Sequence, residues 1–210
     1  MKAPAEIDRE AAAQDAEARA RILGAAFGAF MEHGYRRTST LEIATRAKVS
    51  KRDLYALVGN KQEILHACVA NRARRMVPPG ALPAAQSRPA LVDTLTRFGA
   101  TLITELCHPA VIGMHRLAIA EGRDSPEISR EIIRTGEATR AAVAAFLADA
   151  QGAGLVDDGD PHAMAELFLD LVAAPWMMLR VLIGGDAPSA QQARRRAAAA
   201  VDAFGRLHLT

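Results

Sequence analysis

The chain has 210 residues, of which 50% are hydrophobic, 24% are charged and 4% are aromatic. This length suits one large domain or two small ones, and this composition excludes an intrinsically disordered chain, a collagen-like repeat and a mucin-like stalk. Alanine supplies much of the apolar fraction. An interior rich in Ala and Leu, with few aromatic or β-branched residues, favours helices over sheets.

The two cysteines, Cys68 and Cys107, lie far apart in the sequence, which predicts neither a disulfide framework nor a structural zinc site. The first 19 residues carry eight charges and leave no apolar segment for a secretory signal peptide. The most apolar stretch, Leu167–Ile183, is interrupted by two charged residues and a proline, so it is too polar for a membrane span. We therefore expect a soluble protein of the reducing cytoplasm that does not contact membranes.

The formal net charge of +2 conceals an uneven distribution. Residues 1–76 hold 14 Lys and Arg against 9 Asp and Glu, whereas residues 77–210 hold 12 against 15. Within the first part, residues 33–64 alone carry seven basic and three acidic side chains. A basic segment joined to a mildly acidic one suggests a module that binds polyanions, attached to a module with a different task.

Hydrophobic spacing and helix-start signals divide the first third of the chain into short helices. Apolar residues recur every three or four positions over residues 19–31, and Gly34 follows as a stop signal. Three polar residues stand three positions before an acidic one, which is the spacing of a capping box: Ser39, Ser50 and Asn60. The predicted helices cover 19–31, 40–47 and 51–57, and a longer one starts at Lys61.

Three prolines and a glycine in residues 76–83 predict a long loop or a domain boundary. No later segment alternates between apolar and polar residues as a half-buried strand does, and no internal repeat is present. The sequence therefore predicts an all-α fold. The later helices are expected at 89–107, 111–121, 126–151, 161–183 and 189–207.

The two short helices joined by residues 48–50 have the proportions of a helix-turn-helix. Ile43, Val49 and Leu54 can form its small core. The start and the exposed face of the second helix then fit the major groove of DNA, where a helix N-terminus brings side chains to base edges.

Residues 22–65, which read ILGAAFGAFMEHGYRRTSTLEIATRAKVSKRDLYALVGNKQEIL, resemble the DNA-binding domain of the TetR (tetracycline repressor) family. About 45 residues match in order, and the matching elements are the first-helix stripe ending at Phe30, then Gly34-Tyr35, Thr38-Ser39, Ile43-Ala44, Val49-Ser50-Lys51, Leu54-Tyr55 and Asn60-Lys61 with Glu63. The remainder is similar to a family C-terminal domain through HRLAIAEGRDSPEI, the helix through FLADAQGAGLV and the apolar segment ending LRVLIG.

The resemblance implies a helix-turn-helix DNA-binding domain at residues 17–66 and a helical ligand-binding and dimerisation domain at residues 67–210. It implies a homodimer that binds a palindromic operator on double-stranded DNA and acts as a repressor. A small apolar effector would release it by shifting the fourth helix, Lys61–Arg75, and so changing the separation of the two recognition helices. Neither catalysis nor a cofactor nor a metal is expected.

The predicted DNA-binding surface surrounds the second short helix. Lys51 and Arg52 are expected near bases. Lys61 and Tyr55 are expected on phosphates, because a lysine at a helix start opposes the helix dipole and because family members use the matching tyrosine in this way. Lys48 stands where the family usually has a turn glycine, so a left-handed backbone is expected at a lysine. The full predicted set is Thr38, Ser39, Thr40, Lys48, Ser50, Lys51, Arg52, Tyr55, Ala56 and Lys61.

Large apolar side chains at helical spacing in the C-terminal part predict a mainly apolar pocket for an uncharged or weakly polar effector. A filled core is the alternative interpretation of the same residues. The predicted lining is Phe98, Leu102, Leu106, Met114, His115, Leu117, Phe146, Phe168 and Leu171, with His115 as a candidate donor of one hydrogen bond.

Residues 164–183 include 16 hydrophobic residues among 20, more than one domain of this size covers easily. A second copy of the chain is therefore expected to bury part of them, and the alanine-rich last helix allows two backbones to approach closely. The predicted dimer interface is Trp176, Leu179, Ile183, Ala197, Val201 and Phe204.

An alternative function comes from two E-x-x-H pairs, Glu63 with His66 and Glu105 with His108. Two such pairs on different helices are half of a di-iron carboxylate site, with Glu121 and Glu166 available as further ligands. This pattern would make the protein a helical oxidoreductase. Such short motifs occur often by chance, and Pro109 ends the helix directly after His108.

Overall fold

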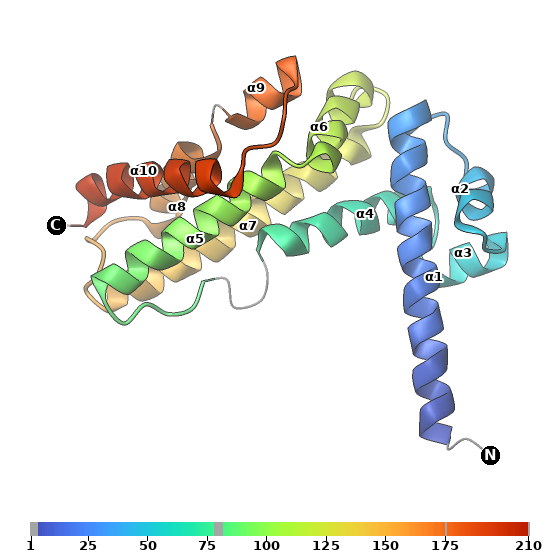
Figure 1. The fold of residues 1–210 in the computed structure, drawn as a ribbon, viewed down its shortest axis with the longest axis horizontal. Helices are drawn as coiled ribbons and strands as arrows, with labels where there is room; N and C mark the ends of the chain where they lie inside the picture. The colour runs from blue at the N-terminus through green and yellow to red at the C-terminus, as the bar shows by residue number, and fades with distance from the viewer. Residues whose placement is uncertain (1–3, 78–81, 175, 210) are drawn as a thin grey trace. The chain divides into compact units, whose positions relative to one another are not determined.

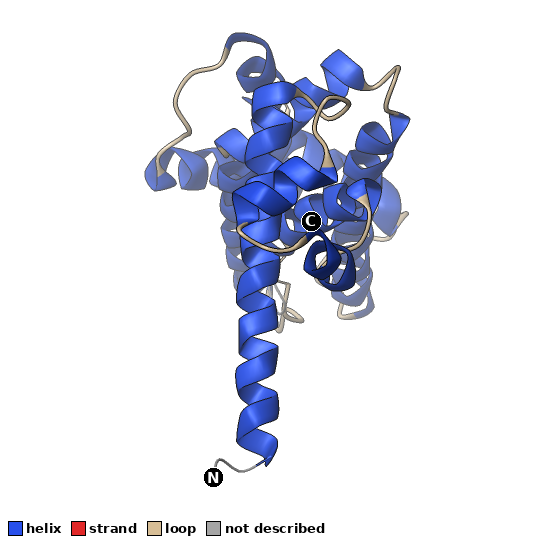
Figure 2. Ribbon diagram, turned by 90° about the vertical axis from the view of Figure 1, so that its right-hand side faces the viewer, coloured by secondary structure: helices blue, strands red, loops and turns tan. Residues whose placement is uncertain are grey.

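The computed structural model describes residues 4–77, 82–174 and 176–209, and every regular element within these ranges is a helix (Figures 1 and 2). The prediction of an all-α fold is confirmed. The helices are α1 (Pro4–His33), α2 (Thr40–Ala47), α3 (Lys51–Leu57), α4 (Lys61–Met76), α5 (Arg88–Leu106), α6 (Pro109–Glu121), α7 (Pro126–Gly152), α8 (Pro161–Ala173), α9 (Trp176–Ile183) and α10 (Ala190–His208).

The chain forms two compact units. The first contains residues 1–71 together with 117–131, and the second contains residues 72–116 together with 132–210. Three helices, α4, α6 and α7, therefore contribute residues to both units. The first unit includes the predicted helix-turn-helix, with the end of α6 and the start of α7 added to it.

The core of the first unit is built from the apolar stripe of α1 and from α2, α3 and α4. Ile22, Phe30, Ile43 and Leu54 are fully buried. The rings of Phe30 and Tyr35 lie with their centroids 5.2 Å apart, so the turn after α1 packs onto the same core. The 3.6-residue periodicity of the sequence thus corresponds to a real buried face.

Helix α1 begins 15 residues earlier than the periodicity predicts, at Pro4 rather than near Arg19. The added segment has no apolar stripe, and residues 11–17 are all exposed. Alanine and glutamate are strong helix formers, and proline is favoured at the first helical position, so local propensity supports a helix without packing. A search for amphipathic periodicity cannot find such a helix.

The core of the second unit forms where α5, α8 and α10 meet. The centroids of the Phe98 and Phe168 rings are 6.5 Å apart, and those of Phe168 and Phe204 are 5.8 Å apart. Gly99 allows the close approach of α10, because a Cβ atom at this position would lie 3.2 Å from the Cβ of Ala197. Aromatic rings therefore fill the middle of this unit, and small residues let its helices cross closely.

The single helix expected over 161–183 is two helices, α8 and α9. Ala174 has φ −81° and ψ 142°, the extended conformation that a residue directly before a proline prefers. The Arg196 side chain of α10 donates hydrogen bonds to the carbonyl oxygens of Leu171 (2.9 Å) and Ala174 (2.8 Å). Pro175 thus explains why α8 ends here. Arg196 donates hydrogen bonds to carbonyl oxygens at the C-terminal end of α8 that have no partner within the helix.

Candidate nucleic-acid interface

The turn between α2 and α3 is closed by a lysine in the left-handed conformation. Lys48 has φ 55° and ψ 46°, and it is the one non-glycine residue with positive φ in the described part of the chain. Its N–H donates to the carbonyl of Thr45 (3.2 Å), and the N–H of Val49 donates to that of Ala44 (3.1 Å). The left-handed backbone predicted at Lys48 is present. For a residue with a Cβ atom such a conformation costs roughly 1 kcal/mol or more.

Serine side chains begin both helices of the motif. The Ser39 Oγ accepts a hydrogen bond from the N–H of Glu42 at 3.1 Å. The Ser50 Oγ accepts from the N–H of Asp53 at 3.0 Å and donates to the Asp53 carboxylate at 2.7 Å. These caps fix where α2 and α3 start, and each is worth about 1 kcal/mol.

Helix α3 buries one side and presents the other to solvent. Leu54 is fully buried, whereas Lys51, Arg52 and Ala56 are exposed and Tyr55 is 45% exposed. The Lys51 Nζ lies 5.9 Å from the centroid of the Tyr55 ring, whose hydroxyl is 3.4 Å from the Oγ1 of Thr40. Five predicted DNA-binding residues, four on α3 and one on α2, therefore share one surface.

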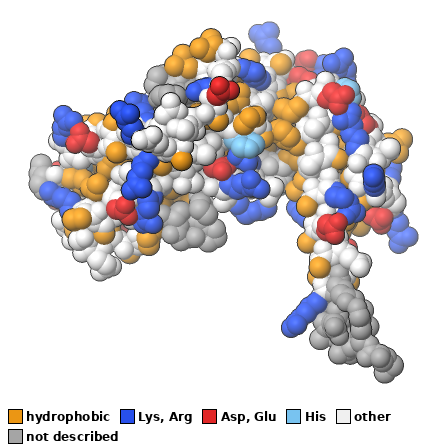
Figure 3. Space-filling model, viewed as in Figure 1, with side chains coloured by type: hydrophobic (Ala, Val, Ile, Leu, Met, Phe, Trp, Pro, Cys, Tyr) orange, Lys and Arg blue, Asp and Glu red, His pale blue; other side chains and the backbone are white. Residues whose placement is uncertain are grey.

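The positive charges of this surface are available to an outside partner. Lys48, Lys51 and Arg52 are exposed, and no described carboxylate forms an ion pair with any of them. Figure 3 shows Lys and Arg side chains along the side of the molecule formed by α2 and α3. Cationic side chains at the start of a recognition helix can contact both phosphates and base edges of DNA.

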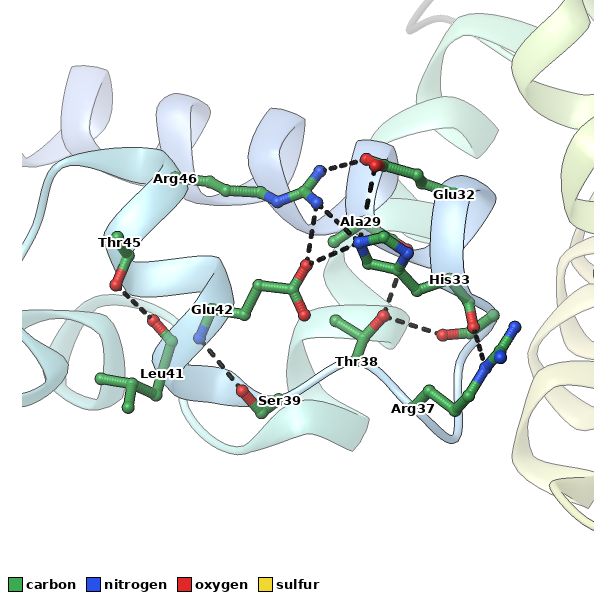
Figure 4. Close-up of polar contacts among 11 residues, drawn as sticks. Ala29, Glu32, His33, Arg37, Thr38, Ser39, Leu41, Glu42, Thr45 and Arg46 are labelled. Carbon is green, nitrogen blue, oxygen red and sulfur yellow. Dashed lines mark hydrogen bonds and ion pairs between the residues drawn. The ribbon is translucent and has the colours of Figure 1, made fainter.

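Thr38, one of the predicted DNA-binding residues, has a different role. Its side chain is only 2% exposed, and its hydroxyl lies 3.1 Å from the carbonyl oxygen of Ala29 and 2.8 Å from that of Gly34 (Figure 4). The Thr38 hydroxyl therefore holds the turn after α1. Ser39, by contrast, stays exposed while it caps α2.

Lys61 is also committed to the protein itself. Its Nζ lies 3.1 Å, 3.3 Å and 3.2 Å from the carbonyl oxygens of Tyr35, Arg36 and Thr38. It also lies 4.5 Å from the centroid of the Tyr35 ring. A lysine ammonium has three protons, and these three carbonyl oxygens can accept all of them, so Lys61 holds the turn after α1.

A polar network that the sequence analysis missed fastens α2 to α1 (Figure 4). The Arg46 guanidinium lies 2.7 Å from Glu32, 2.9 Å from Glu42 and 2.9 Å from the Nε2 of His33. The hydrogen bond and charge of Arg46 lower the pKa of Glu32. The i, i+4 spacing of Glu42 and Arg46 was the available signal. The charge of Arg46 is therefore balanced by Glu32 and Glu42, whereas Lys48, Lys51 and Arg52 keep their exposed charges.

The corner between α6 and α7 belongs to the first unit and adds acidic contacts to the turn after α1. A Glu121 carboxylate oxygen accepts from the N–H of Arg36 at 2.9 Å, and Asp124 lies 2.7 Å from the Arg36 guanidinium. Burial, together with the charge and hydrogen bond of Glu127, raises the pKa of Tyr35 to about 12. No local sequence pattern indicates that this corner packs against the turn after α1.

The predicted effector-site residues are distributed between the core and its edge. Phe98, Leu102, Phe146 and Phe168 are buried in the second unit, and Leu106 and Leu171 pack partly buried against that core. Met114 is buried, and the His115 Nδ1 lies 2.9 Å from the carbonyl oxygen of Val111. Leu117 belongs to the first unit. The ring stacking at Phe98 and Phe168 agrees with the alternative of a filled core at these two positions.

Half of the predicted dimer interface is buried inside a single chain. Ala197, Val201 and Phe204 are at most 2% exposed and belong to the core of the second unit, so they offer no surface to a partner. The alanine-rich face of α10 packs on α5 and α8 within the chain. Leu179 and Ile183 are 48% and 80% exposed, and the side chain of Trp176 lies outside the described residues.

The proposed ligands of a di-iron site have other partners. Glu63 accepts the N–H of Asn60 at 2.7 Å, and His66 lies 2.7 Å from Glu131. Glu105 lies 2.5 Å from Arg72. Within the described ranges, no three His, Cys, Asp or Glu side chains are grouped so as to hold a metal ion. The oxidoreductase alternative has no support.

Comparison with known proteins agrees with this geometry. Residues 22–68 match the family described as bacterial regulatory proteins of the tetR family, and residues 93–207 match the AefR-like transcriptional repressor C-terminal domain. The chain belongs to the TetR family. Members of this family are regulators of transcription and not enzymes, and this protein is accordingly a DNA-binding transcriptional regulator with a helix-turn-helix. No described helix has the length and apolar character that crossing a membrane requires.

Individual relatives and solved structures match this chain over most of its length. The HTH-type transcriptional repressor SCO4008 of Streptomyces coelicolor is 31% identical over 183 residues, which cover 83% of this chain and 88% of the relative. A TetR-family regulator from Mesorhizobium loti has a similar structure, with a TM-score of 0.76, 25% identity and coverage of 93% and 98% of the two chains. The flavonoid-responsive regulator FrrA also has a similar structure, with a TM-score of 0.72, 25% identity and coverage of 91% and 97% of the two chains.

Proposed function

We propose that this TetR-family protein is a cytoplasmic homodimeric repressor that binds a palindromic operator and leaves it when a small molecule binds. The observation that carries the proposal is the exposed face of α3, where Lys51 and Arg52 have no acidic partner among the described residues. We assign DNA binding to residues 17–66, and effector binding and dimerisation to residues 67–210. Repression is supported by the relative SCO4008, which is a repressor.

On DNA, Lys51 and Arg52 are the proposed base-contacting residues. Tyr55 and Thr40 lie beside them and suit phosphate contacts, and Lys48 adds a positive charge at the turn. Lys61 has no direct contact in this proposal, since its ammonium holds the turn after α1. Two copies of this surface, one helical turn of DNA apart, would bind the two halves of a palindrome.

The proposed dimer contact uses the exposed face of α9. Met178, Leu179, Leu182 and Ile183 are between 48% and 80% exposed, and hydrophobic side chains gather at this helix (Figure 3). An exposed apolar patch of neighbouring large side chains marks an interaction surface. We propose that a second copy of the chain covers this face, because regulators of this family typically act as dimers.

The proposed effector is a small molecule with an apolar body. The name of FrrA, one of the similar structures, describes it as flavonoid-responsive, and this supports the proposal. In this chain the candidate contacts are Leu106 and Leu171, at the edge of the second core, and Met114 and His115 on α6. The proposal excludes Phe98 and Phe168, whose rings pack against each other.

Selection of bound sites from random double-stranded DNA with the full-length protein tests the proposed function. We expect a palindromic consensus with half-sites one helical turn or a multiple apart. Arg52→Ala should relax the preference at one symmetric pair of positions, and Arg97→Ala, an exposed arginine of α5, should not. Recovery of random sequences, or of a site without twofold symmetry, would contradict the proposal.

A further inference from the structure

A largely buried ion pair joins α4 to α5 in the second unit. The Nη2 of Arg72 lies 2.5 Å from the Oε2 of Glu105, and the two side chains are 16% and 18% exposed. Arg72 stands near the end of α4, and Glu105 stands in the last turn of α5. Charges taken this far out of water are stable only when their remaining polar atoms also find partners.

One remaining polar atom of this pair, the Nε of Arg72, lacks such a partner in the described part of the chain. Among the described residues, the buried Nε of Arg72 has no hydrogen-bond acceptor, and the Oε2 of Glu105 meets Arg72 without hydrogen-bond alignment. A buried donor without an acceptor is costly and rare in folded proteins. Arg72 thus keeps a donor that an acceptor from outside the chain can use.

His108 supplies a second donor near the pair. Its Nδ1 accepts a hydrogen bond from the N–H of Ala110 at 3.1 Å, so the neutral ring carries its proton on Nε2. Partial burial and the positive charge of Arg72 lower the pKa of His108. The ring is therefore neutral near pH 7. Because His108 is exposed, a molecule from solvent can contact its ring.

Positive charge exceeds negative charge around this histidine. Beyond the effect of burial, the charges of Arg72 and Arg75 lower the pKa of His108, and the charge of Glu105 raises it. Two cations and one carboxylate leave a net positive site, which favours an anion over a cation. A carboxylate can accept from the Nε–H of an arginine and from an imidazole Nε2–H together.

We propose that Arg72 and His108 form the anion-binding end of the effector site and take the carboxylate of a small organic acid with an apolar body, while Glu105 holds Arg72 when no ligand is bound. The inference rests on the proposed function and refines the class of its effector. The ligand carboxylate competes with Glu105 for Arg72. It thereby weakens the ion pair that joins the end of α4 to α5. The same helix begins at Lys61, directly after the recognition helix, so the change is made in the element that links effector and operator.

Thermal unfolding of the full-length protein tests this site with matched compounds. The probes are benzoate, phenylacetate and octanoate, each compared with its neutral amide and with the corresponding primary amine. At least one acid should raise the Tm, because a ligand that binds the native state stabilises it, while its amide and amine should not. Arg72→Met should abolish this rise, and Glu105→Gln should lower the Kd of the same acid several-fold, because it removes the competing carboxylate.

Arg97→Met is the matched control, since Arg97 is an exposed arginine of α5 paired with Asp93, and it should keep the response to the acid. If Arg72→Met does not fold, the tighter binding expected of Glu105→Gln carries the test alone. The site is refuted if no acid raises the Tm, if amides or amines raise it equally, or if Glu105→Gln leaves the Kd unchanged. Operator binding measured without any ligand tests the proposed function separately, so failure of either hypothesis is distinguishable from failure of the other.

Discussion

The ammonium of Lys61 is bound to the carbonyl oxygen of Tyr35 and lies over the ring of the same residue, at 3.1 Å and 4.5 Å. Two further carbonyls complete its hydrogen bonds. The first residue of α4 therefore holds the turn that leads into α2 and supports the DNA-binding surface from behind. This relationship separates two roles for a basic residue, contact with DNA and support of the residues that make the contact.

Lys61→Met should lower the Tm and weaken operator binding without changing how steeply binding depends on salt. Loss of the ammonium leaves three carbonyls without their donor, whereas no phosphate contact is lost. The matched control is Lys51→Met, which should reduce the slope of log K against log salt by about one unit per chain and leave the Tm nearly unchanged. A reduced slope for Lys61→Met would show that this lysine binds phosphate after all.

Lys48→Gly should raise the free energy of unfolding by about 0.5 to 1 kcal/mol, because glycine adopts the left-handed conformation of this turn without a steric penalty. Lys48→Ala loses the same positive charge but keeps the penalty. Urea unfolding should therefore separate the two variants, while both should weaken operator binding to the same extent. Equal stability of the two variants would mean that the turn stores no strain.

Leu182→Asp combined with Ile183→Asp should produce folded monomers that no longer bind a palindromic operator. Both side chains are at least 68% exposed in the single chain, and charges there would be buried without partners in a dimer. Sedimentation at micromolar concentration measures the outcome. Ile133→Asp, on an exposed position of α7, should remain dimeric, and a wild-type protein that is already monomeric would contradict the interface.

Stability should fall more steeply above pH 10 in the wild type than in Tyr35→Phe. The pKa of Tyr35 is raised from 10 to about 12 in the folded chain by burial and by Glu127, so folding favours the neutral phenol. Its stabilisation is complete below the unfolded pKa of about 10 and is lost as the pH rises through 12. Urea unfolding at several pH values measures this slope. Parallel curves for wild type and Tyr35→Phe would refute the prediction.

Local sequence patterns predicted the parts of the site that depend on local chemistry. Ser39 and Ser50 cap their helices, and Lys48 adopts the left-handed turn, because each of these features is decided within four residues of the chain. The roles of Thr38 and Lys61 could not be predicted in this way. The acceptors of Lys61 lie in a turn 23 to 26 residues earlier, and only folding brings them to its ammonium.

In the second unit, too, local patterns predicted the helices but not the contacts that form only on folding. Hydrophobic spacing located α5, α7 and α10 to within two residues, but it could not say which apolar face would be covered by the chain itself. Val201 and Phe204 are covered by α5 and α8, whereas Ile183 is not. That choice depends on the break before Pro175, which turns α9 into a separate helix.

The α6–α7 corner at residues 117–131, whose acidic side chains contact Arg36, affects how DNA-binding domains can be exchanged between regulators of this family. A chimera that takes only residues 17–66 as its DNA-binding part would leave Arg36 without Asp124 and Glu121, and Tyr35 without Glu127. The transplanted segment would carry its own recognition helix into a host whose α6–α7 corner was shaped for a different turn. Exchange of operator specificity between relatives therefore requires grafting two pieces of chain, and a single crossover after α3 would deliver an incompletely supported module.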